Sequence, residues 1–260
     1  ISVKLKVLKE DIIDAFALIQ EILFHTNFNM VENMKKIVKS AIIKGEYELQ
    51  NNSHYYGIFY SGSNLFPALY IDEITSGIRY YHFLCEISRK LETEPEAIIQ
   101  KLKKTAEYVF IKNNLEIAAG CNNEDFNLIK KTLNHFEIPE KEITIFNYDF
   151  NLKEEKVAFT NTNGIVYNIT SFDFRKNNIP YHGKYQVLRT IINLEYLWNK
   201  VRVQGGAYGC GCKFMNSGFS YFYSYRDPNL RKTYEIYQKL ADDIAVFDVS
   251  DREMTKYILG

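Results

Sequence analysis

One stretch of this chain, residues 184–214, passes from a helix pattern to a strand pattern with two glycines at the point of change. Apolar side chains recur at helical spacing before the change, at Val187, Leu188, Ile191, Leu194, Trp198 and Val201. From Gly206 to Phe214 the residues alternate as they do in a strand. Glycine adopts backbone angles that other residues resist, so Gly205 and Gly206 predict a sharp turn. This feature requires a fold in which a helix passes directly into a sheet.

Two polar side chains flank the glycine pair. Arg202 ends the helix pattern, and Tyr208 opens the strand pattern six residues later. Both donate hydrogen bonds and stabilise negative charge on an oxygen atom, so we take them as candidate catalytic residues. Gly205, Gly206 and Ala207 are candidate substrate-binding residues, because glycine beside a strand lets another backbone approach closely. The alternative is a plain helix–strand turn with a buried tyrosine and a surface arginine.

Strict alternation along residues 206–214 assigns the side chains to two faces. It places Tyr208, Cys210, Cys212 and Phe214 on one face and Ala207, Gly209, Gly211 and Lys213 on the other. The four cysteines of the chain include no C-x-x-C pair, so we expect no disulfide framework. Cys210 and Cys212 then serve as small packing residues; half of a metal site is the alternative, and it would need two more ligands.

Helix and strand patterns interleave along the rest of the chain and include hairpin signals. The sequence therefore predicts an α+β fold with antiparallel or mixed sheets. Helices are expected at 10–25, 29–51, 67–91, 93–111, 123–136, 184–202, 229–246 and from 250 onward, and strands at 1–8, 115–119, 157–161, 165–174, 206–214 and 218–225. The polar residues 139–156 predict a linker between two domains.

Charge and chain ends narrow the possibilities further. Thirty-two basic and thirty-two acidic residues cancel, so we expect no nucleic-acid partner, and no apolar run is long enough to cross a membrane. The chain opens in a strand pattern without an initiator Met and stops in a helix pattern at Gly260, so we take it to be a fragment. We expect a soluble protein, cytoplasmic if bacterial, with an organelle matrix as the alternative.

Several segments carry a resemblance to a known family. Tyr196–Gly209, followed by Ser224–Asn229, resembles the C-terminal half of presequence proteases, which are zinc peptidases of the pitrilysin/insulinase class. Weaker matches lie at Ser2–Leu8, Gly77–Tyr81 and Lys256–Gly260, so the resemblance covers most of the chain.

The resemblance implies four similar two-layer helix/sheet domains, arranged as two halves around a chamber in which unfolded peptides are cut. Residues 1–138 then correspond to the C-terminal part of the third domain, 139–156 to a linker, and 157–260 to the truncated first part of the fourth. The first half of such a protein binds zinc and is the partner of this chain. The second half supplies Arg202 and Tyr208, which bind the substrate carbonyl and its oxyanion.

The zinc motif of that class, H-x-x-E-H, is absent from this sequence. It requires two histidines four residues apart, and none of His25, His54, His82, His135 and His182 meets that spacing. His82 and Glu86 are the nearest approach to a ligand pair, and a third ligand is missing. We therefore expect a metalloendopeptidase whose zinc is bound outside this chain, with no metal bound here and no activity of the fragment alone.

Other functions and weaker sites stay open. The chain could be a non-catalytic peptide-binding or scaffold half of a degenerate family member, or a subunit that completes a separate zinc-bearing chain. Phe219, Tyr221, Tyr223 and Tyr225 alternate on one strand face, which favours core packing over a peptide platform. Asp72–Glu73 suggests a solvated acidic pair, and Arg226–Asp227 a local ion pair that closes a turn.

Overall fold

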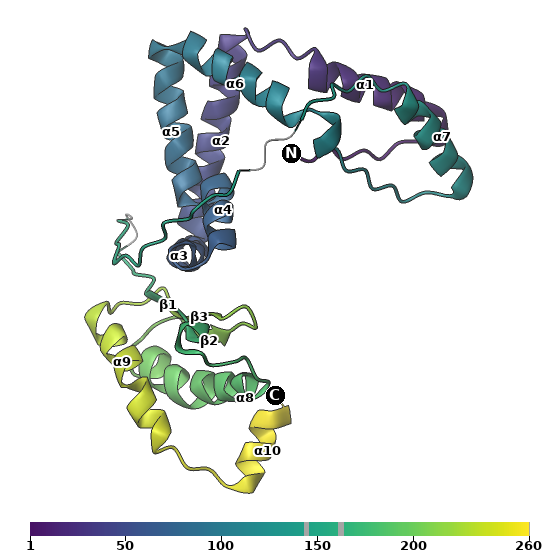
Figure 1. The fold of residues 1–260 in the computed structure, drawn as a ribbon. Coiled ribbons are helices and arrows are strands. Elements are labelled where there is room, and N and C mark those ends of the chain that lie inside the picture. Colours follow the sequence, from purple (N-terminus) through teal and green to yellow (C-terminus); the bar gives the residue numbers. More distant parts are fainter. Residues whose placement is uncertain (143–145, 161–163, 260) are drawn as a thin grey trace. The chain divides into compact units, whose positions relative to one another are not determined.

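The computed structural model describes residues 1–142, 146–160 and 164–259. Two compact units divide the chain: unit 1 comprises residues 1–40 and 86–148, and unit 2 comprises residues 41–85 and 149–260. The elements, labelled in Figure 1 where there is room, are η1 (Lys9–Asp11), α1 (Ile12–Phe24), α2 (Val31–Asn51), α3 (Ser53–Ser63), α4 (Pro67–Ser76), α5 (Ile78–Thr93), α6 (Pro95–Val109), η2 (Lys112–Asn114), α7 (Asn123–Asn134), β1 (Ile169–Asp173), η3 (Phe174–Asn177), α8 (Lys184–Ile191), η4 (Ile192–Val203), β2 (Gly209–Phe214), β3 (Phe219–Tyr225), α9 (Arg231–Ala245) and α10 (Asp251–Leu259). Among these described residues, no helix is both long and apolar enough to cross a membrane.

Unit 1 is built from helices in the part that the structure describes. Helices α1 and α7 lie side by side (Figure 1), and Phe136, which follows α7, makes edge-on ring contacts with Phe16 and Phe24 of α1. Asn122 caps α7 by accepting a hydrogen bond from the backbone N–H of Asp125, as its short polar side chain favours.

The strands expected at 1–8 and 115–119 are wrong, because both segments lie outside regular structure. A strand is stable only when its backbone N–H and C=O groups pair with a neighbouring strand, and neither segment has such a neighbour among the described residues. Residues 157–160 are likewise irregular, and the hairpin turn expected at 161–164 lies largely outside the described residues. Alternation alone therefore predicted strands that lack a pairing partner here.

Unit 2 contains a three-stranded antiparallel sheet in the order β1-β3-β2, which confirms the α+β fold. Strands β2 and β3 form the expected hairpin, and Gly218 turns the chain with a φ of +92°. Helix α8 and the π-helical η4 form one continuous rod, as the spacing of apolar residues predicted over 184–202. That rod and α9 pack on one face of the sheet.

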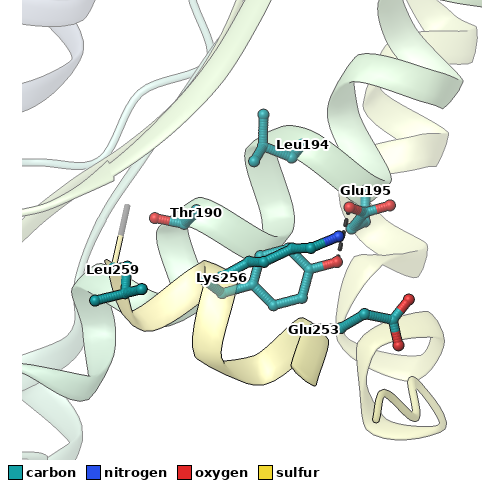
Figure 2. Close-up of a pocket in the computed structure, with 7 residues that line it drawn as sticks. Thr190, Leu194, Glu195, Glu253, Lys256 and Leu259 are labelled. Carbon is teal, nitrogen blue, oxygen red and sulfur yellow. Dashed lines mark hydrogen bonds between the residues drawn. The ribbon is translucent and has the colours of Figure 1, made fainter. Parts of the chain in front are cut away.

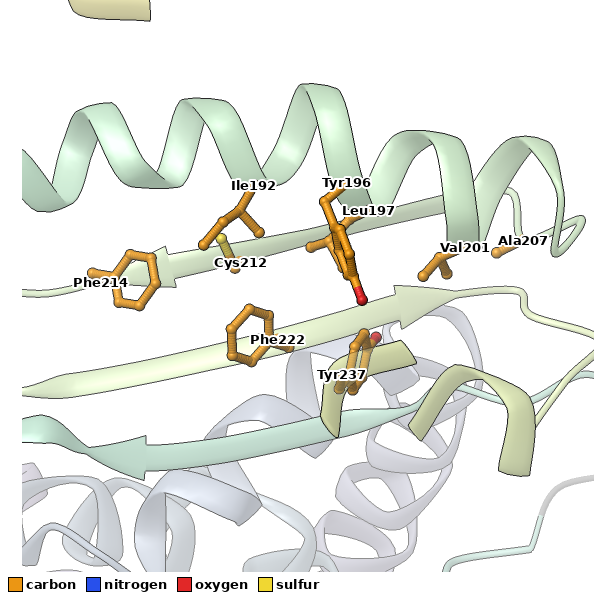
Figure 3. Close-up of a cluster of buried hydrophobic side chains, with 9 residues drawn as sticks. All are labelled: Ile192, Tyr196, Leu197, Val201, Ala207, Cys212, Phe214, Phe222 and Tyr237. Carbon is orange, nitrogen blue, oxygen red and sulfur yellow. The ribbon is translucent and has the colours of Figure 1, made fainter. Parts of the chain in front are cut away.

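A cluster of buried side chains joins the rod, α9 and the sheet (Figure 3). It comprises Ile192, Tyr196, Leu197, Val201, Ala207, Cys212, Phe214, Phe222 and Tyr237. Cys212 is part of the cluster and Cys210 packs against it, as expected for small packing residues. Burial raises the pKa of the Cys210 thiol to about 11 and that of Cys212 to about 12, so both thiols are neutral packing groups at neutral pH.

The opposite face of the sheet meets α3, a helix that lies outside the helix ranges expected from the sequence. Glycines permit this approach, because a Cβ on Gly57 would lie 2.8 Å from Ile169 Cδ1, and one on Gly62 would lie 2.8 Å from the Phe219 ring. The tyrosine row Tyr221, Tyr223 and Tyr225 on this face is half-buried, whereas Phe219 is buried.

A buried acidic group marks the break between α4 and α5. Glu73 is 1% exposed, so the expectation of a solvated acidic pair was wrong for this residue. Its Oε1 accepts a hydrogen bond from the backbone N–H of Arg79 at 2.9 Å, near the start of α5. The Arg79 guanidinium donates to Ser63 and Asn64 and lies 4.4 Å above the Tyr60 ring. The positive end of α5 therefore holds a carboxylate inside the protein.

Two segments, Thr93–Glu96 and Ser250–Glu253, have the residue types of a capping box, which predicts that the first residue caps a helix. This prediction is wrong for Thr93–Glu96, because Thr93 ends α5 and its hydroxyl donates to the carbonyl of Arg89. The box at Ser250–Glu253 is confirmed, because the Ser250 N–H donates to Glu253 and the Glu253 N–H donates back to the Ser250 hydroxyl.

Candidate functional site

The glycine pair forms a tight junction between η4 and β2. The Gly206 N–H donates to the Arg202 carbonyl at 2.9 Å, and the Ala207 N–H donates to the Val201 carbonyl at 3.2 Å. A Cβ on Gly205 would overlap the Val201 carbonyl oxygen, and Gly206 has a φ of +80°. Both positions therefore require glycine, the first for space and the second for backbone angle.

Strict alternation is wrong at the start of β2. The ladder begins only at Gly209, after the turn at Gly206 has rotated the chain. As a result Ala207 is buried in the core cluster with Cys212, whereas the Tyr208 ring contacts Tyr225 of the opposite face. Ala207 thus supports the junction from inside, and its side chain is not available to a substrate.

Tyr208 is an exposed residue held by its backbone. Its N–H donates to the carbonyls of Tyr225 and Arg226 at 3.1 and 3.3 Å, and its side chain is 67% exposed. Its ring centroid lies 5.8 Å from that of Tyr225. The alternative of a turn with a buried tyrosine is therefore wrong, because the phenol is open to solvent.

Arg202 is half-buried on η4 and rests on an aromatic side chain. Its guanidinium carbon lies 3.9 Å from the centroid of the Trp198 ring, four residues earlier on the same helix. A cation over an indole face is attracted by the ring quadrupole, so Trp198 restricts where the guanidinium can point. The sequence pattern indicates Trp198 only as a helix-face residue and gives no sign of this contact.

The segment after β3 clamps the junction from the other side. The Asn229 amide donates to the Gly205 carbonyl at 2.5 Å, and the Pro228 ring lies beside Gly206, 3.5 Å from where a Cβ would sit. Arg226, just before, has a φ of +47°, a left-handed conformation that is rare for a residue with a side chain. The clamp, residues 225–229, is thus a tight turn set against residues 205–208.

Asp227 anchors that clamp in the interior. The residue is 0% exposed, and its carboxylate accepts hydrogen bonds from the Asn168 amide, the Thr233 hydroxyl and the Asn229 backbone at 3.0, 2.7 and 2.8 Å. The expected ion pair with Arg226 is wrong, because Arg226 is exposed and lies over the Tyr225 ring. The Asp-Pro-Asn spelling signals a turn, but no local signal in the sequence points to its distant partner Asn168.

Two side-chain amides cover part of the free edge of β2. Asn193 accepts a hydrogen bond from the Cys212 N–H at 2.7 Å and donates to its carbonyl, and Gln186 donates to the Phe214 carbonyl. Outward-facing backbone groups alternate along an edge strand, so Cys210 is the next outward position, nearest to Tyr208. Among the described residues, no side-chain amide makes such a contact with the backbone of Cys210.

The part of the chain that the structure describes contains no group of three or more His, Cys, Asp or Glu side chains placed to hold a metal ion. His82 is exposed, and Glu86, its expected partner, pairs with Lys90 at 2.5 Å. His82 and Glu86 therefore do not form the ligand pair that the sequence suggested.

A separate cavity lies where α10 meets the α8–η4 rod (Figure 2). It has a volume of about 530 Å³ and is lined by Thr190, Leu194, Glu195, Glu253, Lys256, Tyr257 and Leu259. The Tyr257 hydroxyl donates to Glu195 at 2.7 Å, which raises the pKa of Tyr257 to about 12. This cavity contains neither Arg202 nor Tyr208, so it is distinct from the junction.

Comparisons with known proteins bear on both ends of the chain. A family model described as the PreP C-terminal domain matches residues 156–260, and one described as associated with peptidases of group C of the M16 family matches residues 1–87. The chain is 30% identical over its whole length to Protein HypA of Clostridium perfringens, and it covers 27% of that protein. It is 27% identical, over 95% of its length, to presequence protease 1, chloroplastic/mitochondrial, of Arabidopsis thaliana, of which it covers 23%. Over 87% of its length it is 26% identical to the mitochondrial presequence protease of Yarrowia lipolytica, of which it covers 24%. The chain thus spans about a quarter of the length of these relatives.

Proposed function

We propose a function for this chain from the premise that it is a presequence-protease-like member of the M16 peptidase family and corresponds to the C-terminal half of such proteins. The chain is the non-zinc-binding portion of a zinc-dependent oligopeptidase that degrades unfolded peptides in a closed chamber. Arg202 and Tyr208 bind the substrate carbonyl and the oxyanion that forms from it. The fragment alone is inactive, because the zinc and its ligands belong to the N-terminal half.

The exposed phenol of Tyr208 beside the edge of β2 is the observation that carries this proposal. It sits on a junction whose backbone is held by the Gly206, Ala207 and Tyr208 N–H groups. A donor that is already positioned costs little reorganisation when negative charge develops on the substrate oxygen. Tyr208 therefore suits an oxyanion, and Arg202 suits a substrate carbonyl or carboxylate, with its direction set by Trp198.

The glycine pair makes the tight turn that places these donors next to β2. Gly205 and Gly206 present no side chain at the junction, and the outward backbone groups of Cys210 follow directly. Zinc bound by the other half would activate a water for peptide hydrolysis. This chain contributes the donors and the surface that orient the peptide, so activity requires that both halves contact one substrate.

Tyr208→Phe in the complete protein tests the proposal. Because the change removes one hydrogen-bond donor to the oxyanion, we expect kcat for an unfolded peptide to fall by about a hundredfold, with a smaller change in KM. Tyr221→Phe, which removes a phenol from the same sheet face, should leave kcat unchanged. If Tyr208→Phe also leaves kcat unchanged, Tyr208 has no oxyanion role. A complete protein that binds peptide without cutting it would favour the scaffold alternative.

A further inference from the structure

We infer that Asn229 is a positioning residue for the Arg202–Tyr208 junction, acting through the backbone of Gly205. This inference rests on the proposed function and extends it to a residue that touches neither substrate nor reacting atoms. The amide of Asn229 donates to the Gly205 carbonyl at 2.5 Å, between the two proposed catalytic residues in the chain. Gly205 has no side chain of its own with which to fix that peptide unit.

The backbone of Asn229 is itself held in place from the interior. Its N–H donates to Asp227 Oδ1 at 2.8 Å, and its backbone carbonyl accepts from the Asn168 amide at 2.8 Å. Asp227 is also bound by Thr233 at the start of α9. Residues from three separate parts of unit 2 therefore determine where the Asn229 amide points.

The junction depends on this contact because the other hydrogen bonds that hold the junction do not involve the Gly205 carbonyl. The Gly206 and Ala207 N–H groups bind the end of η4, and the Tyr208 N–H binds the clamp. Gly205 and Gly206 are the most flexible residues in between, and Gly206 occupies a left-handed conformation. Without the Asn229 amide, Tyr208 would keep its place in sequence but sample several positions relative to Arg202, and small displacements of a catalytic group are costly to rate.

A structural role alone would also explain a buried amide contact, so the control must remove a similar contact elsewhere. Asn193 provides it, because its half-buried amide binds the Cys212 backbone in the same unit but away from the junction. Asn229→Leu and Asn193→Leu each replace an amide with an apolar side chain of similar size. Both variants are expected to lose stability, and only the first is expected to lose catalysis.

The experiment uses the complete protein and an unfolded fluorogenic peptide, assayed well below the unfolding temperature. We expect Asn229→Leu to lower kcat at least about tenfold with little change in KM, and Asn193→Leu to leave kcat within about twofold. In a Tyr208→Phe background, Asn229→Leu should lower kcat by less than about threefold. The Tyr208 hydroxyl is already absent there, so displacing residue 208 removes no further hydrogen bond to the substrate. Hydrogen exchange should accelerate at the amides of Gly206 and Tyr208 in Asn229→Leu, and near Cys212 in Asn193→Leu.

Three results would overturn the inference. The first is an unchanged kcat in Asn229→Leu while Tyr208→Phe is impaired, which leaves the proposed function standing. The second is an equal loss in the wild-type and Tyr208→Phe backgrounds, which indicates a general structural effect. The third is an unchanged kcat in Tyr208→Phe itself, which removes the proposed function and this inference together.

Discussion

Among the described residues of unit 2, Asp227 and Glu73 are the buried carboxyl groups, and they differ in how many hydrogen bonds they accept. Asp227 accepts four hydrogen bonds through its two oxygens, from Asn168, Thr233 and Asn229. Glu73 accepts one at Oε1 from the Arg79 N–H, and its Oε2 has no hydrogen-bond partner among the described residues. Both side chains are almost completely removed from solvent. Burial alone therefore does not tell what a buried charge contributes, whereas its set of donors does.

The difference is matched by what each carboxylate holds. Asp227 fixes a turn that reaches the Arg202–Tyr208 junction, so its bonds organise the candidate site. The Glu73 carboxyl group lies at the turn between α4 and α5, and burial raises its pKa while the backbone N–H groups of Arg79 and Ile78 oppose that rise only in part. Replacing a carboxylate whose oxygens all accept hydrogen bonds lowers the free energy of unfolding strongly. Replacing one with an oxygen that lacks a partner lowers it less, because burying that oxygen is itself unfavourable.

Asp227→Asn should lower the stability of the protein more than Glu73→Gln, the matching change at the other buried carboxyl group. Both Asp227 oxygens accept hydrogen bonds, so the new NH₂ group must face an existing donor in either orientation. We expect a loss of about 3 kcal/mol in the free energy of unfolding, measured by urea denaturation followed by circular dichroism. The exposed Asp242→Asn on α9 serves as the control and should change it by less than about 0.5 kcal/mol. Equal effects of the two changes would show that the Asp227 bonds contribute nothing measurable.

Gly205→Ala and Gly77→Ala compare the turn between η4 and β2 with the turn between α4 and α5. A Cβ on Gly205 would overlap the Val201 carbonyl oxygen, which belongs to the rigid end of η4. A Cβ on Gly77 would meet the Glu73 carboxyl group, the end of a side chain that can move. We expect Gly205→Ala to cost about 2 kcal/mol and Gly77→Ala clearly less, by the same measurement. Gly183→Ala, where nothing lies within 4 Å, is the neutral control. A larger loss at Gly77 than at Gly205 would reverse the ranking of the two turns.

Glu73→Gln should change the stability least, and its effect should depend on pH. Because the folded pKa of Glu73 is raised, the folded state binds its proton more tightly than the unfolded state does. The corresponding stability is present below the unfolded pKa and is lost as pH rises through the folded pKa. The amide of the variant does not titrate, so the variant should gain stability relative to the wild type as the pH rises from the ordinary glutamate range through the raised pKa of Glu73. A constant difference across that range would mean that the Glu73 pKa is the same in both states.

The sequence predicted the rod at 184–202, the β2–β3 hairpin and the packing role of Cys212 because each depends on local periodicity. It failed at residues 1–8 and 115–119, because a strand depends on a partner that periodicity does not supply. The Arg202–Tyr208 junction was located correctly through its glycines. Its supports, Asn168 and Thr233, were missed because they lie far away in sequence and carry no local signal. The burial of Glu73 was missed because the acidic pair Asp72–Glu73 gives no sign of the turn between α4 and α5 against which Glu73 is buried.

The stacking of Arg202 on Trp198 gives the protein an optical property. Trp198 is the only tryptophan among the 260 residues, and it is 44% exposed. Its emission therefore originates at one place on η4, directly beneath the guanidinium. A peptide that draws Arg202 away from the indole would change the intensity or colour of that emission. Trp198 is thus an intrinsic fluorescent probe of the position of the Arg202 guanidinium.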